Sequence, residues 1–380
     1  MVPTKSLHHI RLFYASYFGG MGLLLPFFPV YLSEKGFDIS MIGIFTGLLA
    51  IAKVVSPPLT GRALDHKAGN RATFISLATL AAALLMLLMP GVDKPMLLFF
   101  LIFGFGLLWS AVLPLTDGLS VAVSEAALAD YGSLRVWGSI GFVVCTLLGG
   151  GLLADTSMST FPYYMTALLL LTAYAAVGFP AYEEVSKETG HIRSQFSTPF
   201  IILLAAAFLM QFSHGAYYGF FSLYLLDIGY SGWQLGSFWT LGVLAEIVLM
   251  WGWSRPLQQA APGWVLGSCF FLAALRWLGI GLAEAWWVLA AMQLMHAASF
   301  AAFHITAVTW VRRLAPEQKQ ASAQGWYSAC GFGLGLTVGV VSCGVIAERF
   351  GFDAAFFVCA FIAMIGIGIA VLLSRSLADV

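Results

Sequence analysis

Long apolar runs recur along nearly the whole chain, and they constrain its fold more than any other feature. The stretch MLLFFLIFGFGLLWSAV at 96–112 is one example. A helix needs about 20 mostly apolar residues to cross a bilayer. The chain is 60% hydrophobic and 9% charged, so it has too few polar groups to cover a water-soluble globule. The sequence therefore predicts an all-α integral membrane protein.

Turn residues and charges divide the apolar runs into twelve predicted spans. The predicted spans are 11–33, 40–61, 71–90, 95–124, 132–154, 161–180, 199–227, 233–254, 264–283, 286–313, 320–347 and 353–374. The polar insert YEEVSKETGHIRSQFS at 182–197 leaves six of them on each side. We therefore predict two six-helix bundles, 1–181 and 199–380, joined by a cytoplasmic linker at 182–198.

Basic residues gather in the loops on one side of the predicted membrane. If both termini are cytoplasmic, the outer side receives only Lys35, Lys94 and Arg349 of the 18 lysines and arginines. Such an asymmetry indicates which side faces the cytoplasm. The sequence thus predicts a bacterial inner-membrane protein with both termini inside. Because 18 acidic residues balance the basic ones, no global field favours nucleic acid.

The loops carry no pattern typical of an enzyme. No nucleophile and base pair, nucleotide-binding loop or metal-ligand spacing appears in them. The five cysteines lie in apolar runs without C-x-x-C spacing, which favours neither a disulfide framework nor a zinc site. We predict no enzymatic activity, no cofactor and no metal. The expected partners are a small-molecule substrate, protons and the lipid bilayer, and the expected state is a monomer.

Charged and titratable side chains inside the spans are costly and usually face a bundle interior. They are Lys53, Asp117, His214, Glu246, Arg276, His296 and His304, with Arg135 at the start of the fifth span. In the tenth span Gln293, His296, Phe300 and His304 recur at helical spacing, which predicts one polar face. Similar faces on the fourth and seventh spans predict a central cavity. A hydrogen-bonded core histidine, or a structural ion pair between Asp117 and Arg135, is the structural alternative.

Glycines at 331, 335 and 339 recur every four residues in the eleventh predicted span. Small residues at this spacing let two helix backbones approach closely. We predict that this face packs against another helix.

The loop GRALDHKAGNR at 61–71 resembles the signature of the major facilitator superfamily between its second and third helices. Gly61, Asp65, Gly69 and Arg71 keep the pattern, whereas His66 replaces its usual arginine. The stretches PLTDGLS, DYGSLRVWGSIGFV, SHGAYYGFFSLYL and LMHAASFAAFH resemble the phenylpropionate permease group. That group is similar to the lactose permease and to nucleoside proton symporters. The resemblance implies two bundles related by a pseudo-twofold axis, with the substrate between them.

The lactose permease pattern also implies roles for some residues. Asp117 and Arg135 resemble the acidic and arginine partners that hold the sugar in that permease. Glu246, Arg276 and His296 look like its coupling cluster, but Ser299 stands where the permease has its proton-carrying glutamate. The predicted proton-coupling residues are Glu246, Arg276, His296 and His304. The predicted substrate-binding residues are Lys53, Asp117, Arg135, His214, Tyr218, Trp239 and Phe300.

The most favoured function is proton-coupled import of a small aromatic carboxylic acid resembling 3-phenylpropionate. Lys53 supplies a positive charge for a carboxylate, and aromatic side chains near the polar faces can hold a ring. Two alternatives stay open: a proton symporter for a neutral sugar or nucleoside, and a proton-antiport exporter of drugs or metabolites. Uptake and efflux share this architecture, so the fold does not choose between them.

Overall fold

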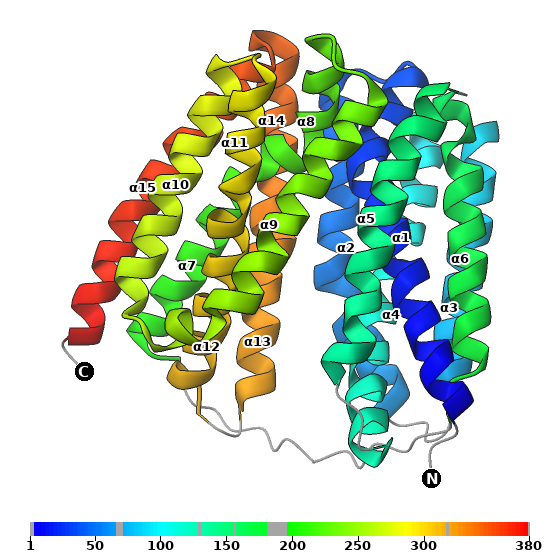
Figure 1. The fold of residues 1–380 in the computed structure, drawn as a ribbon, viewed down its shortest axis with the longest axis horizontal. Coiled ribbons are helices and arrows are strands. Elements are labelled where there is room, and N and C mark those ends of the chain that lie inside the picture. The colour runs from blue at the N-terminus through cyan, green and yellow to red at the C-terminus, as the bar shows by residue number, and fades with distance from the viewer. Residues whose placement is uncertain are drawn as a thin grey trace. The chain divides into compact units, whose positions relative to one another are not determined.

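The computed structural model describes residues 4–65, 71–127, 131–155, 157–180, 196–316 and 319–378. These ranges form helices and no strand, as Figure 1 shows. Within them, twelve helical spans are long and apolar enough to cross a membrane, from Ser6–Glu34 to Phe352–Ala378. The predicted all-α fold with twelve spans is confirmed.

The first six spans are almost continuous helices. They are α1 (Thr4–Glu34), α2 (Ile39–Asp65), α3 (Arg71–Leu88), α4 (Pro95–Ala127), α5 (Tyr131–Asp155) and α6 (Phe161–Val177), with short 3₁₀ turns η1 (Met89–Gly91) and η2 (Met158–Thr160). Helix α1 packs against α5 and α6, and α3 packs against α4 and α6. The side chains of Phe13 and Leu169, both 0% exposed, belong to the apolar core that these contacts bury.

Three of the last six spans are interrupted. The elements are α7 (Thr198–Ser213), α8 (Gly215–Asp227), α9 (Gly232–Gln259), α10 (Pro262–Leu282), α11 (Trp286–Leu294), η3 (Ala297–Ala302), α12 (Phe303–Leu314), α13 (Gln320–Ser328), η5 (Ala329–Gly335), α14 (Leu336–Phe350) and α15 (Phe352–Ala378). The seventh span breaks at His214, and the tenth and eleventh contain the π-helical turns η3 and η5. Such turns occur mostly as local insertions in α-helices and often at functional sites.

The chain divides into two compact units. The first is Met1–Phe37, Ile51–Lys187 and Tyr230–Ser237, and the second is Asp38–Ala50, Glu188–Gly229 and Phe238–Val380. In the second unit α10 packs against α15, and α7 packs against α15 and η5. The predicted linker at 182–198 lies mostly outside the described residues, so the predicted boundary between the bundles stays a prediction.

The glycine face of the eleventh span packs against α7, as predicted. A Cβ atom added to Gly335 would lie 2.5 Å from the carbonyl oxygen of Phe208, and one added to Gly339 would meet the carbonyl of Phe212. Helix backbones that approach this closely leave no room for a side chain. The four-residue spacing therefore builds a helix contact.

Replacing Gly339 by valine is expected to destabilise the second unit by about 1–3 kcal/mol or more, because the added methyl groups press on the α7 backbone. The measurement is thermal unfolding of the purified protein. Gly368→Val on α15 is the matched control, since a Cβ there meets nothing within 4 Å. Equal unfolding temperatures for the two variants would contradict the close packing of α7 and α14.

Candidate functional site

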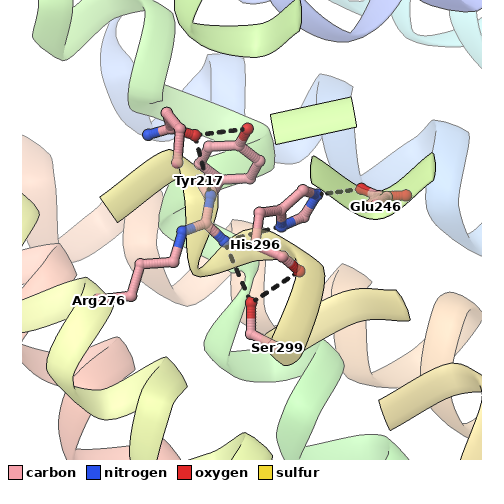
Figure 2. Close-up of polar contacts among 6 residues, drawn as sticks. Tyr217, Glu246, Arg276, His296 and Ser299 are labelled. Carbon is pink, nitrogen blue, oxygen red and sulfur yellow. Dashed lines mark hydrogen bonds and ion pairs between the residues drawn. The ribbon is translucent and has the colours of Figure 1, made fainter. Parts of the chain in front are cut away.

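Arg276 of α10 is the buried centre of a polar cluster in the second unit (Figure 2). Its side chain is 0% exposed. Nη1 donates to His296 Nδ1 at 2.8 Å and to Ser299 Oγ at 3.4 Å, and Nη2 donates to Gln293 Oε1 at 3.1 Å. These three partners lie on α11, at the junction after it and in the π-helical turn η3. The tenth span therefore wraps its polar residues around one guanidinium group.

His296 lies between Arg276 and Glu246 of α9 and joins the two charges. Its Nε2 lies 2.7 Å from Glu246 Oε1, while its Nδ1 accepts from Arg276. A guanidinium group can only donate, so Nδ1 carries no hydrogen, and Nε2 of the neutral ring must carry it and donate to Glu246. The arginine thus fixes the tautomer of His296. It also makes Glu246 the acceptor at the far end of the chain of hydrogen bonds.

Aromatic rings cover the guanidinium group of Arg276. Its Cζ lies 4.3 Å from the ring centroid of Tyr217 and 4.4 Å from that of Trp277. Tyr217 donates its hydroxyl to Gln293 Oε1 at 3.1 Å and packs against Trp239, with centroids 4.5 Å apart. Cation–π contacts are strongest where water is excluded. These rings cover a buried charge that forms no ion pair with a carboxylate of the described residues.

His214, at the break between α7 and α8, lies beside this cluster. Its Nδ1 lies 2.8 Å from the carbonyl oxygen of Met210, so that nitrogen carries the hydrogen and donates it. Its Nε2 is buried and has no hydrogen-bond partner among the residues that the structure describes. The ring lies 5.9 Å from that of His296, and it is stacked with that of Tyr218 at 5.8 Å. His214 therefore offers one uncommitted acceptor next to the cluster.

A column of rings continues from His296 along the tenth span. Phe300 is stacked on His296 with centroids 5.4 Å apart, and His304 is stacked on Phe300 at 6.2 Å. His304 Nδ1 lies 3.1 Å from the hydroxyl of Tyr327 on α13. The predicted face with His296, Phe300 and His304 is thus confirmed as a set of side chains in contact.

A second polar cluster surrounds Asp117 in the first unit. The carboxylate oxygen Oδ1 accepts from the hydroxyl of Tyr14 at 2.6 Å and from that of Tyr131 at 3.2 Å. The guanidinium Cζ of Arg135 lies 3.9 Å from the ring centroid of Phe18 and 5.3 Å from that of Tyr14. Tyr14 therefore contacts both Asp117 and Arg135. In the described part of the chain, this ring rather than a direct ion pair connects the two charges.

Lys53 lies on α2, in the part of that helix that belongs to the first unit. Its side chain is partly buried. No ion pair or hydrogen bond joins its ammonium group to another described residue. An unpaired cation within a membrane span is costly and marks a candidate functional site.

The signature-like loop can be compared with the structure only in part. Helix α2 ends at Asp65 and α3 begins at Arg71, so the loop joins two helices as the resemblance implies. Residues 66–70, with His66 and Gly69, lie outside the described residues.

Sequence reasoning did not single out Tyr131 or Tyr327. Tyr131 lies four residues before Arg135, a spacing that puts both side chains on one face of α5. Tyr327 has no such signal, because it meets His304 only through the packing of α13 on α12. A tyrosine in an apolar run is as typical of core packing as of a site.

Among the described residues, twelve apolar spans hold a buried polar cluster around Arg276 and a partly buried one around Asp117, an arrangement typical of a membrane transporter. Residues 7–358 match the MFS_1-like family, and the chain belongs to this family. It is thus a secondary transporter of the major facilitator type and a multi-pass membrane protein, and it is not an enzyme.

Named relatives agree with this assignment. The chain is 27% identical over 374 residues to the probable 3-phenylpropionic acid transporter of Escherichia coli, which covers 95% of this chain and 96% of that protein. It is 28% identical over 373 residues to maltose permease of Geobacillus stearothermophilus, with 96% and 93% covered. Its fold is similar to the crystal structure of nucleoside transporter NupG, with a TM-score of 0.83, 16% identity and 97% and 98% coverage.

Proposed function

We propose that this transporter imports a small aromatic carboxylic acid resembling 3-phenylpropionate and couples its movement to protons. The observation that carries the proposal is Lys53, a cation in a membrane span with no described partner. The similarity to the probable 3-phenylpropionic acid transporter over nearly the whole chain also supports it. The substrate's carboxylate would supply the missing counter-charge.

Replacing Lys53 by alanine is expected to weaken binding of 3-phenylpropionate by about tenfold to a hundredfold. A charge-assisted hydrogen bond contributes roughly 1.5–3 kcal/mol, and 1.4 kcal/mol corresponds to a factor of about ten. The uncharged amide analogue lacks the carboxylate, so its affinity should hardly change. Dissociation constants of both compounds, measured for wild type and variant, provide the test.

Lys94→Ala is the matched control, because Lys94 is an exposed residue directly before α4. It should leave both dissociation constants unchanged. If Lys53→Ala lost equal affinity for the acid and for its amide, Lys53 would have a structural role. The neutral-substrate alternative would then be favoured.

Proton coupling is proposed for the cluster of Glu246, His296 and Arg276. His296 Nδ1 can take up a proton only if the hydrogen bond from Arg276 breaks, because both groups would otherwise point a hydrogen at each other. A change in protonation therefore has to move the guanidinium group or the ring. This link between proton uptake and side-chain position is what coupling requires. His296 is the proposed relay or alternative carrier, and His304, stacked on the other side of Phe300, belongs to the same proposed set.

A neutral sugar or nucleoside is the second candidate substrate, and the surroundings of Asp117 favour it. The carboxylate has tyrosine hydroxyls as partners, and a substrate hydroxyl can replace either of them. Maltose permease is among the relatives. A thermal-shift screen against aromatic acids, sugars and nucleosides separates the candidates, because a ligand at 100 times its dissociation constant stabilises by about 2.7 kcal/mol.

We also propose that the protein is a monomer of the bacterial inner membrane with both termini in the cytoplasm. The basic residues of the loops support this orientation. Import is distinguished from proton-antiport export by a pH jump on proteoliposomes. Inward substrate movement down an imposed proton gradient supports import, and movement against the proton flux supports export.

A further inference from the structure

A pocket of about 510 Å³ lies in the second unit, where α9 and α12 end and α13 begins. Most of its wall comes from α12, with Gln258 of α9 and Gln320 of α13 completing it. Its size is within the range of small-molecule sites. Arg276, His296 and Glu246 do not line it, and of the predicted proton-coupling residues it shares only His304.

The charged and polar groups of this pocket are suited to an anion. His304, Arg312 and Arg313 line it together with the two glutamine amides, and none of its described lining residues carries a carboxylate. Clusters of arginine without acidic neighbours commonly bind carboxylate or phosphate groups. The charge of the pocket therefore favours a negatively charged ligand.

The two arginines differ in what they already contact. Arg313 donates through Nη2 to the carbonyl oxygen of Gln258 at 2.9 Å and lies on the ring of Trp310, with Cζ 5.1 Å from its centroid. It is thus held in place as part of the wall. Arg312 is exposed, and no described residue forms an ion pair or hydrogen bond with it. Arg312 is the cation that remains available for a ligand.

Apolar groups lie beside these charges. Ile305 and Val308 line the same pocket and offer contact to the hydrocarbon part of a ligand. Inorganic phosphate has no hydrocarbon part. An organic carboxylate has a hydrocarbon part as well as a negative charge. The mixture of arginine and aliphatic side chains is what a small organic acid requires.

The pocket is connected to the Arg276 cluster by side chains in contact. His304 lines the pocket and is stacked on Phe300, which is stacked on His296. His296 in turn binds Arg276 and Glu246. The rings of His304, Phe300 and His296 therefore lie between a ligand that contacts His304 and the carboxylate of Glu246.

We propose that this pocket is a second binding site for a small organic carboxylate, with Arg312 as its charge partner and Ile305 and Val308 against its apolar body. The inference deepens the proposed function, because it gives the transported acid a peripheral site next to the column of rings. It does not depend on Lys53, which belongs to the other unit.

The test is a titration of the purified full-length protein with 3-phenylpropionate in nanodiscs of phosphatidylcholine, a lipid without net charge. Wild type should show two binding events. Arg312→Gln should weaken one of them by about tenfold to a hundredfold, the loss of a charge-assisted bond. Val308→Trp, which fills the pocket, should remove the same event. Arg349→Gln, at the end of α14 and outside the pocket, is the matched control and should change neither event.

The outcomes separate this inference from the proposed function. One event that depends on Arg312 and not on Lys53 would support the pocket and contradict the assignment of Lys53. One event that depends on Lys53 and is unchanged in Arg312→Gln and Val308→Trp would overturn the second site. Tighter binding of inorganic phosphate than of 3-phenylpropionate, lost in Arg312→Gln, would overturn the assignment of the pocket to an organic acid.

Discussion

Asp117→Asn is expected to reduce substrate uptake by about a hundredfold or more while the protein still reaches the membrane. The substitution keeps the shape of the side chain but removes the negative charge that accepts hydrogen bonds from Tyr14 and Tyr131. Arg135, which lies over Tyr14, then has no negative charge on the carboxyl partner of that tyrosine. Each hydrogen bond to a charged group contributes roughly 1.5–3 kcal/mol, and the substitution weakens both of them. Initial uptake rates in cells, corrected for the amount of protein in the membrane, provide the measurement.

Tyr131→Phe is the matched variant for this prediction. It deletes only the longer of the two hydroxyl contacts and leaves the charge of Asp117 in place. A neutral donor lost from a charged acceptor costs roughly 1.5–3 kcal/mol, so uptake should fall less than in Asp117→Asn. Normal uptake by Asp117→Asn would contradict a functional role of the Asp117 cluster, and an equal loss in both variants would assign the effect to packing instead of charge.

Glu246→Gln should abolish accumulation of substrate against its gradient, but it should retain exchange of substrate across the membrane. The glutamine oxygen can still accept from His296 Nε2, so the cluster around Arg276 keeps its geometry. Without a carboxylate that takes up and releases a proton, a pH gradient cannot bias the two access states of the transporter. Two assays on the same proteoliposomes test this: accumulation driven by a proton gradient, and counterflow with substrate on both sides.

Asp93→Asn is the acidic control for Glu246→Gln. Asp93 precedes α4, is 92% exposed and forms an ion pair with Lys35 at 3.1 Å. A surface pair of this kind contributes little, so both assays should match wild type. If Glu246→Gln still accumulates substrate under a proton gradient, the proton is carried by another group, and His296 is the next to test.

The column formed by His296, Phe300 and His304 illustrates what a linear pattern can predict. The spacing of these residues along one span is local, and a helix converts it directly into a shared face. Their ring contacts bear this out. For Ser299 the sequence indicates only that a serine replaces the proton-carrying glutamate of the lactose permease pattern, and it predicts no contact with Arg276. Ser299 contacts Arg276 from the π-helical turn η3, and the spacing of residues in the sequence does not predict such a turn.

The sequence by itself determined that the described part of this protein forms twelve helices able to cross a membrane, and it singled out the charged and histidine residues of the two polar clusters. Both follow from the cost of moving each side chain between water and lipid, which depends on residue type and run length. Only the tertiary structure decided the partners of these residues. His296 stands between Arg276 and Glu246, and Tyr14 links Asp117 to Arg135, because helices far apart in the sequence pack together there. A hydrogen bond tolerates changes of only a few tenths of an ångström in the distance between donor and acceptor. The order of residues along one helix does not fix that distance, because it depends on how neighbouring helices pack.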